Sequence, residues 1–386
     1  MTGFLARLYA FKAVDAFILI YPLYAVMFVE DGLSPVQVTT ALAVWSITAF
    51  VMEIPAGVVA DRLPRRVVLA WAQVARLAGY ALWLAWPHFW GFVGGFLLWG
   101  IKSAFTSGTF EALVFDELTA QGRQGDYTRI IGRADAVQFI AVLAASGAAA
   151  LVIPFGYGVV LAASLAACAL AAALPLTFPK VLPAGASADL RYLQHLKLGL
   201  RHAAANRQVL DLVVFVALML AFGALDEFWS IFAAQAGLAK PAIALFIGAI
   251  SAGQAAAAWL AHRAARLPAR TFYALALANG LVLLAGAAAF RPAAVIALIA
   301  FTAGFKVIDT VFEARLQRAI PDETRATVAS VKGFATQVAV TGLYLGFGPL
   351  AALWGYRGAF LIFGAVVAAV GAIYLIRGPL RAKADA

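Results

Sequence analysis

The chain has 386 residues, of which 64% are hydrophobic and only 12% are charged, and its formal net charge is +10. Its mean hydropathy is +0.90. In soluble domains about a quarter of the residues are charged, so this composition excludes an ordinary soluble protein and indicates a chain surrounded mainly by lipid. The positive charge does not indicate a nucleic-acid partner, because the cations cluster in alternate loops, as orientation in a membrane requires. The single cysteine, Cys168, excludes an intramolecular disulfide.

Apolar runs of about 20 residues recur along the whole chain, and each is long enough to cross a hydrocarbon core as a helix. Because the runs are continuous and do not alternate with polar residues, they favour helices over a membrane barrel. The first run has no small-residue cleavage site after it, so we expect a retained helix and not a signal peptide. The sequence predicts twelve spans, at 4–29, 36–60, 67–86, 90–117, 128–153 and 157–178 in the first half and at 208–235, 241–264, 270–290, 293–318, 324–350 and 356–376 in the second.

The charges in the loops predict the orientation of these spans. The connections after spans 2, 4, 6, 8 and 10 and the C-terminal tail hold most of the arginines and lysines. The opposite side holds only Lys240, Arg291 and Arg357. Positively charged loops stay on the cytoplasmic side. We therefore expect a multi-pass protein of the cytoplasmic (inner) membrane with both termini in the cytoplasm.

The longest connection, 179–207, divides the chain nearly in half. Between residues 190 and 200 leucines recur at helical spacing opposite basic residues, which predicts an amphipathic helix lying on the cytoplasmic face of the membrane. A simple tether between the halves is the alternative. The expected domains are an N-terminal six-helix bundle at 1–178, a cytoplasmic linker at 179–207 and a C-terminal six-helix bundle at 208–386.

The two halves of the chain resemble each other. The tripeptide FEA at 110–112 recurs at 312–314, and the dipeptide TR at 128–129 recurs at 324–325. The segment ADRLPRR after span 2 has a degraded counterpart, AHRAARLPAR, after span 8. The offset stays near 200 residues, which indicates one duplication. Two parallel repeats of six spans, related by an axis along the membrane normal, are an architecture of secondary transporters.

The segment MEIPAGVVADRLPRR ends span 2 with one acid and three arginines. It fills every key position of the pattern G-x-x-x-D-R-x-x-R-R, with Gly57, Asp61, Arg62, Arg65 and Arg66. On these residues the chain resembles the major facilitator superfamily (MFS), and the twelve spans, the central loop and the repeat extend the resemblance over nearly the whole chain. The resemblance implies an all-α integral membrane protein with the MFS fold, in which twelve transmembrane helices form two pseudo-symmetric six-helix bundles. It also implies secondary transport by alternating access.

The resemblance further assigns a role to this motif. It implies that Asp61 approaches the cytoplasmic end of span 11 and that the arginines meet acids near the end of span 4. Such a latch holds the bundles together while the cytoplasmic side is closed. The physical chemistry is consistent with this role, because a carboxylate is stabilised near a helix N-terminus and Gly57 would let two helices approach closely. The alternative is that the arginines only set the topology.

A second group of charges lies at 110–133. Glu111 and Asp116 lie near the inner end of span 4, and Arg129 and Arg133 open span 5, one turn apart on one face. Because an isolated charge in a membrane is costly, we expect these acids and arginines to pair. The resemblance makes the pairs part of the cytoplasmic gate, and static links between helices are the alternative.

Two lysines lie deeper in the membrane. Lys102 is about halfway along span 4 and Lys306 about halfway along span 10, so they are related by the repeat and could face each other across a central cavity. Ionisable groups at such depth line a bundle interior or a wet cavity. Asp309, less than a turn from Lys306, is a further candidate for the substrate or proton-coupling site. The alternative is that each lysine pairs permanently with a nearby acid and does not contact substrate. Arg76, in the inner half of span 3, is expected to snorkel to the interface.

Three deep acids are candidates for proton coupling. A proton-coupled carrier needs a carboxylate whose affinity for protons changes with its surroundings, and Asp15, Asp226 and Glu227 are available. Aromatic side chains give a weaker signal, because tyrosine and tryptophan also anchor helices at membrane interfaces. The aromatic candidates for lining a substrate cavity are Tyr21, Tyr24, Trp45, Trp99 and Trp229.

These patterns lead to three hypotheses of function. The first is proton-coupled export of a small organic molecule, and the second is uptake or exchange of an anionic metabolite through a Lys102/Lys306 cavity. The third is a non-transporting membrane sensor or assembly partner, against which the complete latch motif argues. No P-loop, catalytic pattern or metal-ligand cluster is visible, so we expect no enzyme activity, cofactor or metal. We expect a monomer in lipid whose partners are a small-molecule substrate and protons or another coupling ion.

Overall fold

The computed structural model describes residues 2–179, 207–319 and 325–377, and all regular structure within them is helical. The chain divides into two compact units. Unit 1 comprises Met1–Asp189 with Lys240–Gly248, and unit 2 comprises Leu190–Ala239 with Ala249–Ala386. The amphipathic helix predicted near residues 190–200 lies outside the described residues. The predicted division into three domains stays a prediction.

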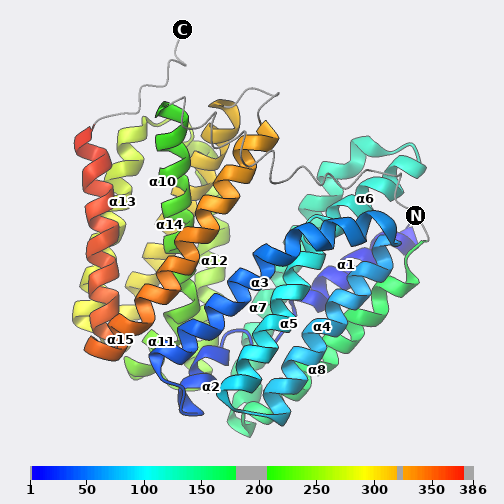
Figure 1. The fold of residues 1–386 in the computed structure, drawn as a ribbon, viewed down its shortest axis with the longest axis horizontal. Coiled ribbons are helices and arrows are strands. Elements are labelled where there is room, and N and C mark those ends of the chain that lie inside the picture. The colour runs from blue at the N-terminus through cyan, green and yellow to red at the C-terminus, as the bar shows by residue number, and fades with distance from the viewer. Residues whose placement is uncertain (1, 180–206, 320–324, 378–386) are drawn as a thin grey trace. The chain divides into compact units, whose positions relative to one another are not determined.

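The described residues 2–179 of unit 1 form eight α-helices, which Figure 1 shows joined by short connections. Three short 3-10 helices occur in its connections, at Gln124–Asp126, Ile153–Phe155 and Leu174–Thr177. The α-helices are α1 (Thr2–Ala16), α2 (Tyr24–Glu30), α3 (Pro35–Arg62), α4 (Arg65–Ala85), α5 (Phe89–Thr106), α6 (Thr109–Ala120), α7 (Tyr127–Val152) and α8 (Tyr157–Ala173).

Unit 2 contains the remaining described helices, except that the first residues of α12, Lys240–Gly248, belong to unit 1. A 3-10 helix, η4 (Ala224–Phe228), joins α10 to α11, and another at Pro292–Ala294 precedes α14. The α-helices are α10 (Arg207–Gly223), α11 (Trp229–Gln235), α12 (Lys240–Ala264), α13 (Ala269–Ala289), α14 (Val295–Ala319) and α15 (Arg325–Arg377).

The prediction of twelve spans is confirmed. Among the described residues, nine helical segments are long and apolar enough to cross a membrane. The last of them, Val331–Arg377, holds two spans, because Gly355 interrupts the helical geometry of α15 with a φ of 68°. The two spans that this criterion omits are the first and the fourth, each of which is divided into two shorter helices.

The interruptions of spans 1 and 4 correct the expectation of continuous helices. In span 1, α1 ends at Ala16 and α2 begins at Tyr24. In span 4, α5 ends at Thr106 and α6 begins at Thr109, and the intervening Gly108 has a φ of 70°, which glycine adopts at low cost. Span 7 is interrupted differently, because η4 tightens the helix to 3-10 geometry between α10 and α11.

Backbone groups at membrane depth need partners inside the protein. At the interruption of span 1 the amide of Ile20 donates to Ser164 Oγ of α8 at 3.0 Å. Ser164 is fully buried, and its hydroxyl in turn donates to the carbonyl of Val160 at 2.9 Å. Non-helical backbone in the middle of a span is therefore supported here by the neighbouring helix.

The same spans pack together in both units. In unit 1, α4 packs against α5 and α8, and α1 packs against α7. In unit 2, α13 packs against α14 and α15, and α10 packs against α15. Since α15 supplies spans 11 and 12, these contacts join equivalent spans, the third with the fourth and sixth and the first with the fifth. The structure thus has the predicted two pseudo-symmetric bundles.

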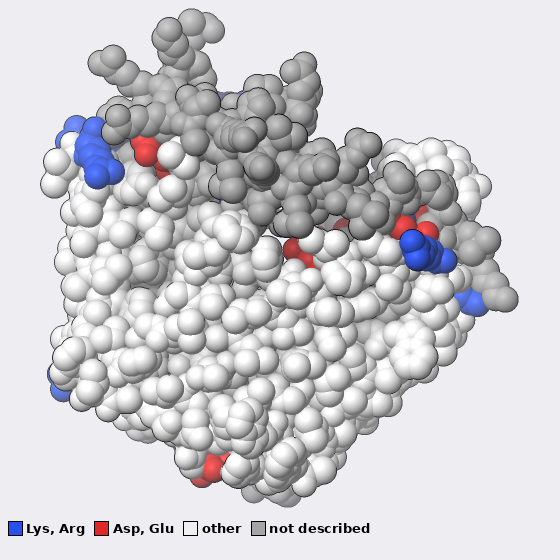
Figure 2. Space-filling model, viewed as in Figure 1, with Lys and Arg blue, Asp and Glu red and all other residues white. Residues whose placement is uncertain are grey.

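The outer surface is suited to lipid. Figure 2 shows a broad area of uncharged side chains on the face seen there. Large apolar side chains are exposed on helices of both units, including Trp71 at 65%, Ile140 at 64% and Leu353 at 72%. In a soluble monomer such an extensive apolar surface would promote aggregation, whereas lipid tails solvate it.

Glycine allows α4 and α5 to approach closely. A Cβ at Gly95 would lie 1.9 Å from Trp83 Nε1 and 2.8 Å from the carbonyl oxygen of Gly79. Trp83 is buried, and its Nε1 donates to the carbonyl of Phe92 at 3.2 Å. Small residues at such crossings let transmembrane helices gain van der Waals contact.

We predict that Gly95→Ala destabilises the protein by about 1–3 kcal/mol, because the added methyl overpacks the contact between α4 and α5. The measurement is the midpoint of thermal unfolding of the purified protein in detergent. Gly147→Ala in α7 is the matched control, because its Cβ would meet nothing within 4 Å and alanine favours the helix by about 1 kcal/mol. Equal midpoints for the two variants would contradict the prediction.

Candidate functional site

The acid at the interruption of span 1 binds three donors. Asp15 lies in the last turn of α1, and its Oδ1 accepts from Gln73 Nε2 at 2.7 Å. The same oxygen lies 2.8 Å from Arg76 Nη2 and 3.3 Å from Lys102 Nζ. Gln73 and Arg76 come from α4 and Lys102 from α5. We call these four residues the Asp15 cluster, and it joins the first, third and fourth spans of unit 1.

Arg76 is a structural centre of this cluster. Its Nη1 donates to the backbone carbonyl of Asp15 at 3.0 Å, and its Nη2 donates to Gln73 Oε1 at 2.7 Å. The last carbonyls of a helix lack partners within the helix, so Arg76 also caps the end of α1. The expectation that Arg76 snorkels to the interface is wrong. Its side chain is only 5% exposed, because Asp15 supplies a counter-charge inside the bundle.

The Asp15 cluster has a surplus of positive charge. Two cations, Arg76 and Lys102, face one carboxylate. Lys102 has the longest of the three contacts to Asp15 and is more exposed than Arg76, at 13% against 5%. Arg76 is held by further hydrogen bonds to its neighbours, so Lys102 is the cation that another anion can most easily engage.

The corresponding interruption in unit 2 carries two acids. Asp226 and Glu227 both lie in η4. Asp226 is exposed and Glu227 is half-buried. Within the described part of the chain, Asp226 forms no salt bridge. The two interruptions therefore differ in charge, since cations surround the acid of unit 1 and none pairs with Asp226 in unit 2.

Lys306 pairs with an acid on its own helix. Its Nζ lies 2.8 Å from Asp309 Oδ2, one turn along α14, and its side chain is 41% exposed. The two deep lysines therefore both contact carboxylates, as the alternative in the sequence analysis expected. The proposed arrangement of Lys102 opposite Lys306 stays a prediction.

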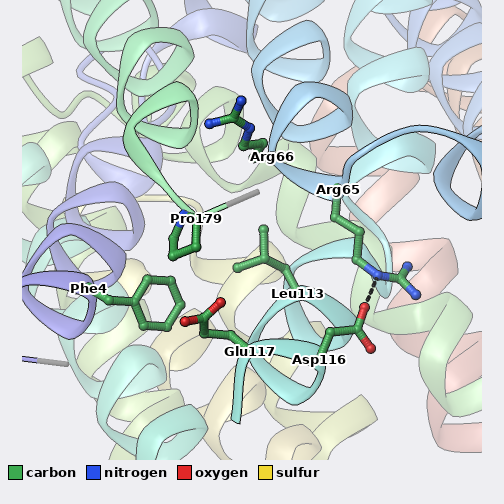
Figure 3. A pocket seen from close by; sticks show the side chains of 7 residues that line it. All are labelled: Phe4, Arg65, Arg66, Leu113, Asp116, Glu117 and Pro179. Carbon is green, nitrogen blue, oxygen red and sulfur yellow. Dashed lines mark hydrogen bonds and ion pairs between the residues drawn. The ribbon is translucent and has the colours of Figure 1, made fainter. Parts of the chain in front are cut away.

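At the end of unit 1 that carries the loop arginines, two residues of the latch motif are held in place. Arg65 Nε lies 2.7 Å from Asp116 Oδ2 of α6, and both side chains are mostly buried, at 14% and 21% exposed. Arg66 Nη1 donates to the carbonyls of Leu176 and Phe178 at 3.1 and 2.9 Å. Figure 3 shows a small pocket beside these side chains, into which Glu117 also points. The start of α4 is thus tied to α6 and to the end of the sixth span.

The other residues of the motif have no such partners within the part of the chain that the structure describes. Among the described residues, Asp61 and Arg62 form no ion pair. A Cβ at Gly57 would meet nothing within 4 Å. Glu53, an exposed residue of the same segment that the sequence analysis did not select, also forms no ion pair there. The approach of Asp61 to span 11 stays a prediction.

The second group of charges is arranged differently from the expectation. Arg129 Nη2 lies 2.7 Å from Asp126 Oδ1, one turn earlier in the chain, and is 57% exposed. Arg133 is exposed, and neither it nor Glu111 forms an ion pair within the described residues. The expected pairing of span 4 acids with span 5 arginines is therefore not found, because Asp126 supplies a local partner and Asp116 binds Arg65.

Most of the candidate aromatics meet in unit 1. The Trp99 ring lies 6.1 Å from Tyr21, 6.0 Å from Tyr24 and 6.0 Å from Trp45, measured between centroids. Tyr24 is only 3% exposed and is therefore a packing residue. Trp229 of unit 2 is 1% exposed and stacks on Phe360 at 5.5 Å, so it also belongs to the core and does not line a cavity.

A further ion pair was not predicted from the sequence. Lys240 Nζ, at the start of α12, lies 2.6 Å from Glu30 Oε2 at the end of α2 and 4.6 Å from the ring centroid of Tyr157. Both charged side chains are about 40% exposed, at 40% and 42%. Burial, together with the adjacent carboxylate of Glu30, raises the pKa of Asp31. The sequence offered no signal for this pairing, because its partners are far apart in the chain.

The fold and these charges define a class of protein. Twelve apolar spans in two repeated units, with interrupted helices that carry ionisable groups, are the architecture of a membrane transporter. Among the described residues, no group of three His, Cys, Asp or Glu side chains is placed to hold a metal ion.

The family follows from the sequence. The model of the family described as Major Facilitator Superfamily matches residues 8–342, and the chain belongs to this family. No curated protein matches the sequence of the chain.

Solved structures share the fold at low sequence identity. A crystal structure of the nucleoside transporter NupG matches with a TM-score of 0.78 and 13% identity over 97% of this chain and 98% of that one. A bacterial homologue of the human lysosomal transporter Spinster matches with a TM-score of 0.75 and 13% identity over 100% and 99% of the two chains. A D-xylose–proton symporter matches with a TM-score of 0.61 and 14% identity over 94% and 95%. These likenesses show the fold.

We predict that Asp15→Asn destabilises the protein more than Lys102→Gln does. Without Asp15, Arg76 and Lys102 remain in the bundle with no counter-charge, which costs about 3–5 kcal/mol. Without Lys102, the Arg76 and Gln73 contacts still satisfy Asp15. The measurement is the midpoint of thermal unfolding in detergent.

Glu30→Gln is the control for this comparison. It removes the same charge from an ion pair that is about 40% exposed, and exposed pairs contribute about 0–1 kcal/mol. If Asp15→Asn lowers the midpoint no more than Glu30→Gln does, Asp15 does not hold the cluster together.

Proposed function

We propose that the chain is a proton-coupled secondary transporter of a small organic solute, working by alternating access in the cytoplasmic membrane with both termini in the cytoplasm. The observation that carries the proposal is the difference between the two interrupted first spans. Each repeat interrupts its first span at an acid. Cations surround Asp15 in unit 1, whereas Asp226 of unit 2 forms no ion pair with a described residue.

This difference separates two roles for carboxylates at membrane depth. An acid that is held by cations keeps its charge and serves as a fixed part of the scaffold. An acid without a cation is costly in its charged form unless water reaches it, so its protonation changes with its access to water. Alternating access changes the hydration of such a group in each cycle. Asp226 is therefore the leading candidate for the proton carrier, with its neighbour Glu227 as the second.

Two further observations support transport coupled to protons. Interrupted helices at mid-span hold substrate and coupling-ion sites in transporters of several folds. One of the solved structures that shares this fold is titled as a D-xylose–proton symporter. Asp15 is the weakest of the three candidate acids for this role, because Gln73, Arg76 and Lys102 all bind its carboxylate.

We predict that Asp226→Asn abolishes accumulation of the solute driven by a proton gradient but keeps exchange of labelled for unlabelled solute. The reason is that exchange needs binding and alternation but no net movement of protons. The assay uses proteoliposomes and a solute found by a thermal-shift screen, since a ligand stabilises the state that it binds. Loading the solute inside or outside shows whether the protein exports it, as the sequence analysis expected, or takes it up.

Asp211→Asn is the matched control, because Asp211 lies on the same span, near the start of α10, and is half-buried. It should leave gradient-driven transport unchanged. The Glu227→Gln variant tests the second candidate. If Asp226→Asn and Glu227→Gln both accumulate solute at the rate of the unmodified protein, neither acid carries the coupled proton.

A second candidate function is uptake or exchange of an anionic metabolite. The observation that favours it is the surplus positive charge of the Asp15 cluster. A cation that is only partly neutralised forms charge-assisted hydrogen bonds with carboxylate or phosphate. Lys306 supports anion transport less than the sequence analysis expected, because Asp309 neutralises its positive charge.

We also propose that the latch motif forms the cytoplasmic gate. The mostly buried pair of Arg65 and Asp116 fixes the start of α4, which keeps the end of α3, with Asp61, in a defined position.

We predict that Asp61→Asn and Asp116→Asn both increase the time that the cytoplasmic side spends open. The measurement is the distance between spin labels at the cytoplasmic ends of spans 2 and 11. Arg129→Gln is the control, because Arg129 is exposed and pairs with Asp126 on its own segment. No change in distance for the two acid variants would refute the latch.

A further inference from the structure

Trp99 is the centre of an aromatic cluster in unit 1. Besides Tyr21, Tyr24 and Trp45, its ring has close neighbours in three buried side chains. These are Tyr80 at 5.6 Å, Trp83 at 6.0 Å and Phe96 at 5.7 Å between centroids, with the Phe96 ring stacked at 9°. Rings at these separations attract one another beyond their buried area, so the neighbours hold Trp99 in one orientation.

Three members of the aromatic cluster are accessible and four are buried. Tyr24, Tyr80, Trp83 and Phe96 are at most 3% exposed. Tyr21 is 42% exposed, and Trp45 and Trp99 are half-buried. Because the rings of Tyr21 and Trp45 both contact the Trp99 ring, the three form a continuous aromatic surface that is partly accessible and is backed by packed side chains.

The surplus cation of the Asp15 cluster lies beside this surface. Lys102 follows Trp99 by three residues on α5, and residues three apart are neighbours on one side of a helix. Lys102 keeps part of its side chain accessible, at 13%, while it contacts Asp15 at 3.3 Å. An aromatic surface and an incompletely neutralised ammonium group are thus within the reach of one small molecule.

Two hydrogen-bond donors in the cluster lack partners. The indole Nε1 of Trp45 and the hydroxyl of Tyr80 are buried and, within the described part of the chain, form no hydrogen bond. Buried polar groups in native proteins are usually satisfied. Two unsatisfied donors around a half-exposed indole are consistent with a site that a ligand or water completes.

We propose that Tyr21, Trp45, Trp99 and Lys102 form a binding site for a small aromatic carboxylate, whose ring stacks on Trp99 and whose carboxylate pairs with Lys102. The inference rests on the proposed transport function, because it names the class of solute that the carrier takes. A neutral ring leaves the surplus charge of the Asp15 cluster uncompensated, and an aromatic cation adds to it. A carboxylate without a ring leaves the aromatic surface uncovered.

Four probes of similar size separate these cases. Benzoate carries both the ring and the negative charge, benzyl alcohol carries the ring alone, benzylamine carries the ring with a positive charge, and cyclohexanecarboxylate carries the charge without the aromatic ring. Calorimetric titration of the full chain in detergent should give the tightest binding for benzoate, by about tenfold over each of the other three. If benzoate binds no more tightly than benzylamine or benzyl alcohol, the site does not recognise the negative charge of the carboxylate, and the proposed pairing with Lys102 is overturned. Equal binding of benzoate and cyclohexanecarboxylate overturns the assignment of stacking.

Variants locate the site. Trp99→Leu should weaken benzoate about tenfold while it changes cyclohexanecarboxylate little, and Lys102→Gln should weaken both carboxylates about tenfold while it leaves benzyl alcohol unchanged. The matched controls are Trp90→Leu, an exposed tryptophan on the same helix, and Lys12→Gln, a lysine of unit 1 that donates to Gln138 and pairs with no described acid. The thermal midpoint of each variant without ligand reports whether it folds. If folded Trp99→Leu and Lys102→Gln bind benzoate as the unmodified protein does, the site is elsewhere.

Binding in detergent needs no proton gradient, so this test separates the site from the proposed function. Asp226→Asn should keep the affinity for benzoate. If benzoate binds through Trp99 and Lys102 but no solute is driven by protons, the site stands and proton coupling fails. If protons drive another solute and benzoate does not bind, the site fails and the proposed function stands.

Discussion

A charge in the middle of a membrane protein needs a counter-charge or water, and the Asp15 cluster meets this requirement with three spans at once. Asp15 lies in the last turn of α1, and the interruption that follows leaves its carbonyl without a helical partner. Arg76 binds that carbonyl and the carboxylate together. The ion pair therefore does more than neutralise charge. It also satisfies the backbone at the point where the helix stops, so the charge and the interruption stabilise each other.

The two repeats carry different buried polar side chains at equivalent positions of their third spans. Asn279 lies about 200 residues after Arg76, on the third span of unit 2, and is also buried. Its amide donates to the carbonyl of Phe301 at 3.3 Å, and a Cβ at Gly304 would lie 2.4 Å from its Oδ1. A neutral amide packed on a glycine brings no charge to the first span of its unit. Arg76 binds the first span of its unit, whereas Asn279 binds the fourth span of its own. At this position of the third span an arginine, which can neutralise an acid of the first span, stands in unit 1 and not in unit 2.

The sequence predicted the spans well because hydropathy and loop charge act over whole segments. It did not predict the interruptions, since the residues between α1 and α2 are as apolar as the helices that they join. Pro22 was the only local sign of the interruption in span 1. The sequence analysis also misplaced Arg76. An arginine in a span can either snorkel to the interface or pair with an acid, and only the fold shows that Arg76 Nη2 lies 2.8 Å from Asp15 Oδ1. Arg65 does pair with Asp116, an acid near the end of span 4, as the resemblance implied. Arg129 instead pairs with Asp126 on its own segment, a partner that the spacing did not exclude.

A transporter needs one part of its charge to stay fixed while another part changes. An acid bound by two cations and an amide has no reason to release or bind protons as the protein moves, because its counter-charges come from the helices of its own bundle and move with it. An acid on a 3-10 turn that pairs with no described cation has no such protection, and in the proposed function its charge changes with the water around it. A bundle whose charged side chains keep their charge and position can then present a constant binding surface to the solute. In the proposed function, the other bundle, with Asp226, supplies the step that a proton gradient drives.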